Sequence, residues 1–231
     1  MTQPEPYETR TLSGMRGVIA RHMLESLSSA AQLTYFATAD ASGLVDARDA
    51  WKSQGNKVGY EDIILSCLCA SLEDYPDFNG IARGKDVQVH QEVRISVAVA
   101  LPDGLVAPAL SDLRGLIVPE ISVLRRNLVD RARQGRLSVA EMKAGTFTIS
   151  NLGATRVDHF TPILNGGQIG LLGVGQIANK PAALGNGSVG IRPELGLSLT
   201  TDHRFVDGAP SGAFLTSLIE KIEKHPPFPG S

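Results

Sequence analysis

The sequence predicts one α+β domain with a mixed, mostly antiparallel sheet, and three observations support this prediction. The chain of 231 residues is long enough to bury a substantial core, and its 42% hydrophobic and 20% charged residues are typical of a globular protein. Stretches with helical spacing and stretches with strand alternation follow one another without a regular strand–helix repeat. No fixed period or internal boundary follows residue 11. We therefore expect residues 1–11 to be a linker remnant and residues 12–231 to form one domain.

Charge and cysteine content narrow the possible partners. The net charge of -2, from 22 basic and 24 acidic residues, argues against nucleic acid and an anionic membrane as partners. No apolar run approaches the ~20 residues of a membrane span, and the first ten residues do not resemble a signal peptide. Cys67 and Cys69 lie one residue apart in an apolar run, which suits neither a metal site nor a disulfide. We expect free thiols, a cytoplasmic location and no metal.

Hydrophobic periodicity predicts the secondary structure. In the first half we expect a helix over 14–28, a strand over 33–39, a short helix over 44–52 and a helix over 60–75 that Pro76 ends. In the second half we expect neighbouring antiparallel strands over 94–101 and 105–109, a helix from Pro119, strands over 145–153 and 195–201, and a helix over 209–224.

Several side chains in these elements are expected to be structural. His22 lies near the apolar stripe of the first helix and is expected to pack there, as is Trp51 in the core. The helix over 60–75 is expected to be the most buried. The glycines at 166–167 and 173–175 lack the spacing of a phosphate loop and are interpreted as close-packing residues. The arginines interpreted as a solvated face rather than a binding patch are Arg125, Arg126, Arg131, Arg133 and Arg136.

Hydroxyl side chains alternate along the expected strand over 145–153. The strand period of two places Phe147 and Ile149 on one face, and Thr146, Thr148 and Ser150 on the other. The hydroxyl row would then face a polar group. On this stretch alone, the favoured alternative is an edge strand with a solvated threonine face.

The stretch from Thr201 to Gly208 holds one imidazole and two carboxylates directly after an alternating apolar run. Histidine has an unperturbed pKa of ~6.5, so His203 beside Asp202 and Asp207 is a candidate general base. A histidine in a loop is more often a hydrogen-bonded structural residue, and the local sequence leaves both interpretations open.

Several stretches together resemble the acyltransferase components of 2-oxo acid and acetoin dehydrogenase complexes. They are MRGVIAR at 15–21, PDGLVAP at 102–108, GTFTISNLG at 145–153, PILN at 162–165 with LGVG at 172–175, and DHRFVDG at 202–208. Each is weak alone, whereas their shared order and spacing are specific. The resemblance implies a two-layer fold like that of chloramphenicol acetyltransferase and identifies residues 12–231 as the catalytic domain.

The resemblance implies transfer of an acyl group, with acetyl favoured, from a dihydrolipoyl thioester to coenzyme A. His203 would deprotonate the attacking thiol, and the Ser150 hydroxyl would stabilise the oxyanion. Asp207 would either orient the imidazole or anchor the loop by pairing with an arginine, for which Arg16 and Arg21 both remain open. The residues assigned by resemblance to substrate and coenzyme A binding are Asn151, Thr148, Arg204 and Gly208.

The resemblance also implies an assembly. His203 would face Ser150 of a neighbouring chain in a homotrimer, and a larger cubic core remains open. We expect the lipoyl group to be carried on a separate domain or chain, because no lipoyl domain precedes residue 11. Other dehydrogenase-complex components would be partners. Two departures are Asn165-Gly166-Gly167 in place of Asn-Pro-Pro, and a tail over 225–231 without the apolar ending that joins trimers.

Three questions stay open at this level. Succinyl and branched-chain acyl groups are alternatives to acetyl. A small-molecule O-acetyltransferase is a second enzyme hypothesis. A non-catalytic scaffold of a dehydrogenase complex is the third, although inactive relatives lose the histidine whereas His203 and Ser150 are both present here.

Overall fold

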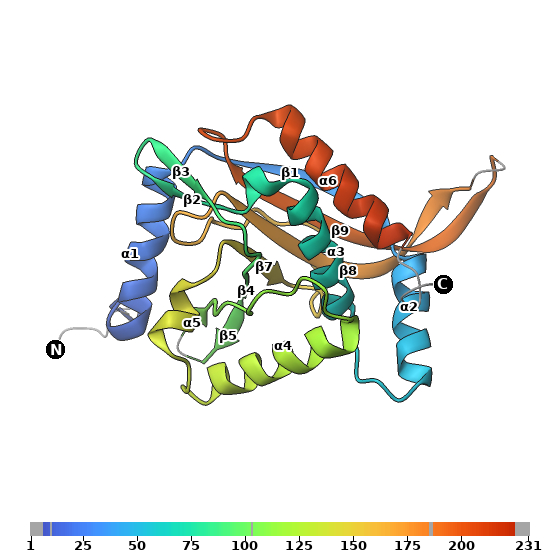
Figure 1. Cartoon of the computed structure of the whole chain (residues 1–231), viewed down its shortest axis with the longest axis horizontal. Coiled ribbons are helices and arrows are strands. Elements are labelled where there is room, and N and C mark those ends of the chain that lie inside the picture. The colour runs from blue at the N-terminus through green and yellow to red at the C-terminus, as the bar shows by residue number, and fades with distance from the viewer. Residues whose placement is uncertain (1–6, 10, 103, 185–186, 225–231) are drawn as a thin grey trace.

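A five-stranded mixed sheet organises the computed structural model, which describes residues 7–9, 11–102, 104–184 and 187–224 (Figure 1). Its strands, in spatial order, are β1 (Gln32–Asp40), β9 (Val189–Asp202), β8 (Gly170–Ala183), β7 (Phe147–Asn151) and β4 (Ile95–Val97). The β1–β9 and β9–β8 pairings are antiparallel, and the β8–β7 and β7–β4 pairings are parallel. The prediction of a mixed α+β fold is therefore confirmed.

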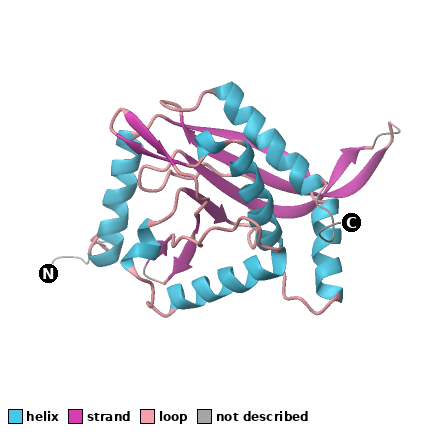
Figure 2. Ribbon diagram, in the orientation of Figure 1, coloured by secondary structure: helices cyan, strands magenta, loops and turns pink. Residues whose placement is uncertain are grey.

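Helices cover one face of this sheet and make the second layer (Figure 2). They are α2 (Ser42–Ser53), α3 (Tyr60–Asp74), α4 (Val118–Arg133) and α6 (Gly208–Glu223), with α1 (Gly14–Ser29) at one end of the molecule and the short α5 (Val139–Lys143) and η1 (Pro76–Phe78) in connections. Phe214 of α6 joins the layers, because its ring stacks 4.4 Å from Phe78 and lies 6.0 Å from Phe147 of β7. Aromatic contacts thus fix α6 over the sheet.

The central helix α3 is deeply buried, as the sequence predicts. It contributes nine buried residues, and Trp51 of α2 is also buried at 5% exposure. Cys67 and Cys69 are free and buried, and burial raises the pKa of each thiol to about 12. Both cysteines are therefore packing residues rather than nucleophiles.

Two small strand pairs lie outside the main sheet. The expected turn after the strand over 94–101 joins β5 (Val99–Leu101) to β6 (Gly104–Val106), which pair antiparallel. The other pair, β2 (Gly80–Arg83) and β3 (Asp86–Val89), was not predicted. Both strands are only four residues long, which is too short for periodicity to identify, and the alternating valines of β3 are exposed.

The expected packing of the first helix was wrong. Met15 and Leu27 are 56% and 50% exposed, and His22 is exposed rather than packed. The buried residue of α1 is Ser26, whose hydroxyl donates to the Leu164 carbonyl at 2.6 Å. Ile19 and Met23 are half-buried, and Ile19 packs against Gly104 of β6. The helix therefore attaches through this contact and the Ser26 hydrogen bond, while the rest of its apolar stripe faces solvent within this chain.

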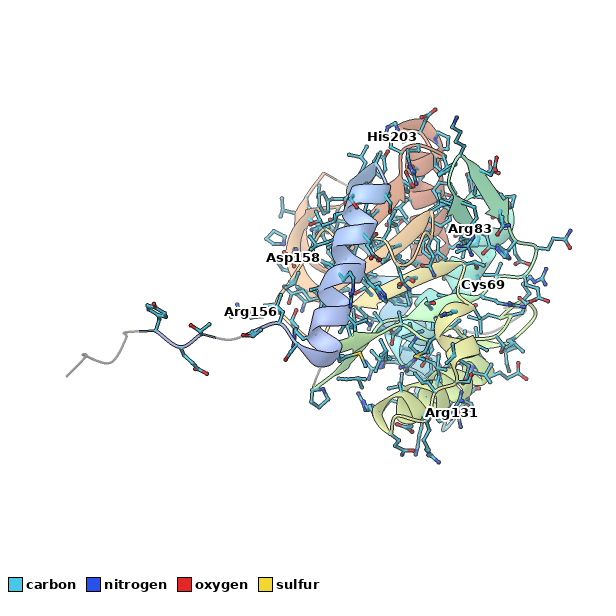
Figure 3. The ribbon with its side chains drawn as sticks, turned by 90° about the vertical axis from the view of Figure 1, so that its left-hand side faces the viewer. Cys69, Arg83, Arg131, Arg156, Asp158 and His203 are labelled. Carbon is cyan, nitrogen blue, oxygen red and sulfur yellow. The ribbon has the colours of Figure 1, made fainter. Side chains whose placement is uncertain are left out.

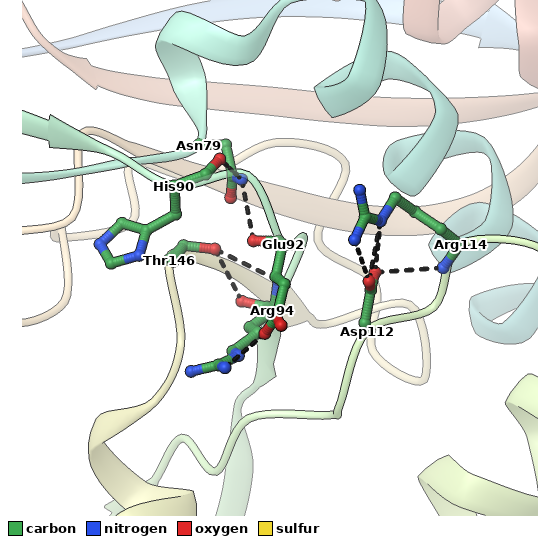
Figure 4. Close-up of polar contacts among 7 residues, drawn as sticks. All are labelled: Asn79, His90, Glu92, Arg94, Asp112, Arg114 and Thr146. Carbon is green, nitrogen blue, oxygen red and sulfur yellow. Dashed lines mark hydrogen bonds and ion pairs between the residues drawn. The ribbon is translucent and has the colours of Figure 1, made fainter.

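The strand β7 confirms the two-faced pattern and excludes the alternative of a solvated edge. β7 lies between β4 and β8, and Phe147 and Ile149 are fully buried in the core. On the other face Thr146 and Thr148 are each 2% exposed. The Thr146 hydroxyl bridges the backbone of Arg94, and Asn79 similarly holds the chain before β4 through the carbonyls of residues 90 and 92 (Figure 4).

Glycines let the outer face of the sheet be covered closely, as expected for residues 173–175. A Cβ on Gly173 would lie 2.9 Å from the Phe160 ring, and a Cβ on Gly175 or Gly196 would lie 1.9 Å from the carbonyl oxygen of Asp158. The segment preceding β8 thus lies directly on the strands, where a side chain would displace it.

Gly196→Ala tests this close contact. The added methyl group should destabilise the fold by about 1–3 kcal/mol through overpacking. Gly212→Ala is the matched control, because no atom lies within 4 Å of its Cβ position on α6 and alanine favours a helix. Urea unfolding should show a lower midpoint for Gly196→Ala and an unchanged or higher midpoint for Gly212→Ala. Equal midpoints would contradict the packing described here.

Candidate active site

His203 lies in the turn between the end of β9 and the start of α6, at the upper end of the molecule in Figure 3. Its backbone N–H donates to the Ala31 carbonyl at 2.8 Å, and the preceding N–H of Asp202 donates to Ile169 at 2.9 Å. The side chain is 43% exposed, and no hydrogen bond joins Nε2 to another described residue. The backbone is thus fixed while the imidazole remains accessible.

Asp202 fixes this turn, a role that the sequence analysis did not assign. Its carboxylate is 1% exposed and accepts hydrogen bonds from the backbone N–H of Ala31 and from the backbone and guanidinium of Arg204, the closest at 2.6 Å. Burial alone would raise the pKa of Asp202, but the hydrogen bonds and charge of Arg204 outweigh it and hold this pKa below its ordinary value. The signal was the Asp-His-Arg order, which puts a cation two residues from the acid.

The Arg204 guanidinium is engaged by Asp202 in this structure, although the resemblance assigned it to substrate or coenzyme A binding. Besides pairing with Asp202, its guanidinium lies 5.1 Å from the centre of the Phe205 ring. Both interactions hold the side chain beside the turn.

Asp207 lies next to the imidazole, which the sequence separation could not establish. Its Oδ1 is 3.6 Å from Nδ1 of His203, within ion-pair range but too long for a hydrogen bond. Asp207 is 82% exposed and occupies the N-cap position of α6, which Gly208 begins. Among the described residues, neither Arg16 nor Arg21 comes within ion-pair distance of it. In this chain its partner is the histidine.

The hydroxyl face of β7 contacts polar side chains of the same chain. Thr148 donates to the side-chain carbonyl of Gln168, and the Asn165 amide donates to Thr148 at 3.4 Å. Gln168 in turn donates to Gly145 at 2.9 Å. Thr148 is thus engaged inside the chain, whereas the half-buried Ser150 has no hydroxyl hydrogen bond to another described residue.

Ser150 and His203 do not meet within one chain. Ser150, Gly173 and Ser198 lie opposite one another across β7, β8 and β9. His203 lies five positions beyond Ser198 in the sequence. At ~3.3 Å per residue along a strand and ~4.8 Å between strands, the two residues are roughly 15–20 Å apart. The two residues of the predicted pair are therefore too far apart to act on one substrate atom within a single chain.

The Asn165-Gly166-Gly167 turn has its own geometry. Gly166 and Gly167 have φ values of 52° and 84°, and Gln168 donates its N–H to the Asn165 carbonyl at 2.9 Å. Proline is locked near -65°, so this turn differs from one built on two prolines. Gly166 is thus a turn residue with no atom within 4 Å of its Cβ position, which corrects its interpretation as a close-packing residue. Gly167 also lies close to β2, because a Cβ there would lie 3.3 Å from the Ala82 carbonyl oxygen.

Arg125, which the sequence analysis placed on a solvated face, is largely buried. Arg125 of α4 is 17% exposed and pairs with Asp62 and Glu61 of α3. The cluster lies at the end of the sheet where β7 finishes. Sequence periodicity could not reveal it, because the partners are 63 residues apart for the Asp62 pair.

The described residues limit other kinds of site. No group of three or more His, Cys, Asp or Glu side chains among them is arranged to hold a metal ion. None of the helices in the described ranges has the length and apolar character needed to cross a membrane. The tail over 225–231, which lacks the apolar ending that the resemblance associates with larger assemblies, lies outside the described residues, as do most of residues 1–11.

A family model described as 2-oxoacid dehydrogenases acyltransferase (catalytic domain) matches residues 4–227. The chain belongs to this family. It is 36% identical over 218 residues to the dihydrolipoyllysine acetyltransferase component of the acetoin cleaving system of Bacillus subtilis, covering 92% of this chain and 54% of that protein. It is 35% identical over 217 residues to the succinyltransferase component of the 2-oxoglutarate dehydrogenase complex of Haemophilus influenzae, covering 92% and 53%. The chain spans about half the length of the curated relatives it matches.

Solved structures confirm the predicted fold of this acyltransferase-family chain. A study of the role of a serine, a histidine and an asparagine in the catalytic mechanism of Azotobacter vinelandii dihydrolipoamide acetyltransferase gives a structure with TM-score 0.87 at 25% identity, covering 94% of this chain and 92% of that one. The cubic core of a pyruvate dehydrogenase multienzyme complex gives 0.86 at 27%, covering 96% and 93%. Chloramphenicol acetyltransferase gives 0.54 at 16%, covering 88% and 92%, which shows the shared fold.

Asp202→Asn tests the anchoring of the His203 turn. Losing the buried charge should cost about 2 kcal/mol of unfolding free energy. Because the pKa of Asp202 is held below its ordinary value of 3.8, the ionised carboxylate stabilises the fold above that pH, and its contribution disappears as the pH falls through the folded-state pKa. Urea unfolding from pH 7 downward should show a constant difference from wild type that shrinks below about pH 4.

Asp112→Asn is the matched control for this variant, because Asp112 pairs with Arg114 at the same two-residue spacing but is 30% exposed (Figure 4). Its cost should stay below ~1 kcal/mol. Equal costs for the two variants would show that the burial of Asp202 is unimportant.

Proposed function

We propose that this chain is the catalytic domain of a dihydrolipoamide acyltransferase, which moves an acyl group between dihydrolipoamide and coenzyme A. The observation that carries the proposal is His203, an accessible imidazole on a backbone fixed by the Ala31 carbonyl and the buried Asp202–Arg204 pair. Membership of the acyltransferase family supports it. The chain matches about half of the relatives' length, so the lipoyl group would be carried on a separate domain or chain.

The first step is proton transfer from coenzyme A. Thiols have an ordinary pKa of ~8.5, so a base is needed to generate the thiolate near neutral pH. His203 would take the thiol proton on Nε2, with Asp207 beside Nδ1 stabilising the imidazolium. The thiolate sulfur then attacks the carbonyl carbon of the acyl-dihydrolipoyl thioester.

The second step is collapse of the tetrahedral intermediate. Attack places negative charge on the former carbonyl oxygen, and the unengaged Ser150 hydroxyl would donate a hydrogen bond to it. Re-formation of the carbonyl breaks the bond to the lipoyl sulfur. That sulfur takes the proton back from His203, which returns the enzyme to its starting state.

The separation of Ser150 and His203 supports a site shared between chains. A donor roughly 15–20 Å from the base in its own chain cannot act on the same carbonyl, so a neighbouring chain would supply Ser150. We propose a homotrimer, with a larger cubic core as the alternative assembly that the likeness to a pyruvate dehydrogenase core supports. Lipoyl domains and other dehydrogenase-complex components would be its partners. The two free cysteines support a cytoplasmic location.

The Azotobacter vinelandii enzyme supports the choice of residues. Its serine and histidine are 52 positions apart, and its histidine and asparagine are four apart. Ser150 and His203 are 53 apart here, and His203 and Asp207 are four apart. Acetyl remains the proposed acyl group, although relatives named for acetyl and for succinyl transfer match this chain about equally.

His203→Ala tests the proposed base. The wild-type protein should transfer acyl groups from coenzyme A to free dihydrolipoamide, with acetyl-coenzyme A preferred over the succinyl and isobutyryl thioesters. His203→Ala should lower turnover by ~10²–10⁴-fold because the thiol proton has no acceptor. Thioester formation is the measurement. Absence of transfer from every donor, or full activity of the variant, would exclude the proposed function.

Ser150→Ala tests the proposed oxyanion donor and the shared site. It should lower kcat by ~10²–10³-fold with little change in coenzyme A affinity. If sites form between chains, unfolding and refolding Ser150→Ala together with His203→Ala should restore about one site in four, those with both residues intact. Refolding each variant alone is the control. A large loss of affinity with unchanged kcat would contradict the role, and no restored activity would contradict a shared site.

A further inference from the structure

Both backbone groups of Ala31 hold the turn that carries His203. The Ala31 carbonyl accepts the His203 N–H at 2.8 Å, and the Ala31 N–H donates to Oδ1 of Asp202 at 3.2 Å. Ala31 lies in the two-residue connection between α1 and β1, and its methyl side chain is exposed. Packing of that side chain does not fix its backbone, so the contacts of the residues on either side decide where Ala31 lies.

Gln32 and Ser26 flank Ala31, and both bind Leu164. The Gln32 side chain accepts the Leu164 N–H through Oε1 at 2.9 Å and donates through Nε2 to the Ser26 hydroxyl at 3.0 Å. The Ser26 hydroxyl donates in turn to the Leu164 carbonyl at 2.6 Å. These three hydrogen bonds, which we call the Gln32 clamp, join the last turn of α1 to the first residue of β1.

Leu164 gives the clamp a fixed point. Its side chain is 1% exposed, and it lies in a segment without helix or strand before β8. Gln32 and Ser26 are therefore the partners of its backbone N–H and C=O. The next residue, Asn165, donates to Thr148 of β7 at 3.4 Å, which ties the same segment to the sheet. A buried polar group that loses its partner costs ~1–3 kcal/mol, so the clamp favours one arrangement.

The clamp lies directly beside the His203 turn. Gln32 is the residue after Ala31, and its backbone pairs with that of Asp202 across β1 and β9. The Asp202 carboxylate holds the turn from the β9 side, but one of its donors is the Ala31 N–H. Displacement of Ala31 would thus loosen both contacts of the turn at once.

We propose that Gln32 is a positioning residue that holds the His203 imidazole in place through Ala31. This inference rests on the proposed function, in which His203 is the base. Leu164 fixes the Gln32 side chain, Gln32 fixes the connection that contains Ala31, and Ala31 fixes the His203 backbone. A reacting group displaced by ~1 Å can cost ~10²-fold in rate, so a looser clamp should reduce turnover.

Gln32→Ala is the direct test. It removes two of the three bonds of the clamp from a half-buried position. We expect kcat to fall by at least about tenfold with the KM for coenzyme A little changed, because Gln32 acts on the proton transfer through His203. Gln32→Glu keeps an acceptor for the Leu164 N–H and should recover part of the kcat. Ser26→Ala should also lower kcat, and the double variant should lower it little further, because both side chains belong to one clamp.

Ser122→Ala is the matched control for Ser26→Ala. Ser122 of α4 is likewise a buried helical serine, and its hydroxyl donates to a loop carbonyl, that of Lys57, at 2.6 Å. The thermal midpoint should fall to a similar extent, because the same kind of hydrogen bond is lost. The kcat of Ser122→Ala should equal that of wild type. Equal falls in kcat for the two serine variants would overturn the inference, since lost stability alone would explain them.

Amide hydrogen exchange reports the position of the turn without depending on activity. The His203 N–H is protected by its bond to Ala31, so its exchange should become at least about tenfold faster in Gln32→Ala and stay unchanged in Ser122→Ala. In a His203→Ala background, Gln32→Ala should lower the residual kcat no further, because the base that it positions is absent. Unchanged exchange in Gln32→Ala, or kcat losses that multiply with that of His203→Ala, would overturn the inference while leaving the proposed function intact. Failure of wild type to transfer acyl groups would overturn both.

Discussion

The buried Asp202 carboxylate is the group on which the geometry of the candidate site depends. At 1% exposure it needs its hydrogen bonds from Arg204 and Ala31, since an uncompensated buried charge is costly. These contacts join the end of β9 to the residue before β1. They also fix the backbone of the turn that contains His203. His203 extends from that turn with 43% of its side chain exposed. The backbone is thereby rigid where the imidazole is accessible, as a proton-transferring group requires.

The mixed direction of the sheet separates the two proposed catalytic residues, Ser150 and His203. β7 and β8 run parallel and β9 runs against them, so the end of β7 that carries Ser150 is remote from the end of β9 that leads to His203. Each chain thus presents the two proposed catalytic residues at separate places. The apolar residues of α1, including Met15 and Leu24, are also exposed. An isolated chain therefore leaves apolar surface in contact with water, as is typical of a surface that contacts another protein.

The short strand β7 is held from both of its faces. On the outer face Thr148 belongs to a buried hydrogen-bonded network with Gln168. On the helical face Ile149 packs in the core, and Oδ1 of Asn151 accepts the Gly153 N–H at 2.7 Å. Ser150 lies between these contacts, so the strand can present an unengaged hydroxyl without being mobile itself.

The sequence by itself determined the longer helices, the strands β1 and β7, the two faces of β7 and the family, because periodicity, proline stops and short motifs depend on residues that are near one another in the chain. It predicted neither β2 and β3 nor the central strand β8, whose apolar, glycine-rich start lacks a clear alternation. It also singled out His203 and Ser150 as the candidate catalytic residues. Only the tertiary structure decided that His22 is exposed, that Arg125 is an internal ion-pair partner, and that His203 and Ser150 are far apart. Burial, ion pairing and strand register depend on residues distant in sequence, such as Asp62 and Arg125, and a local pattern carries no record of which distant segments meet.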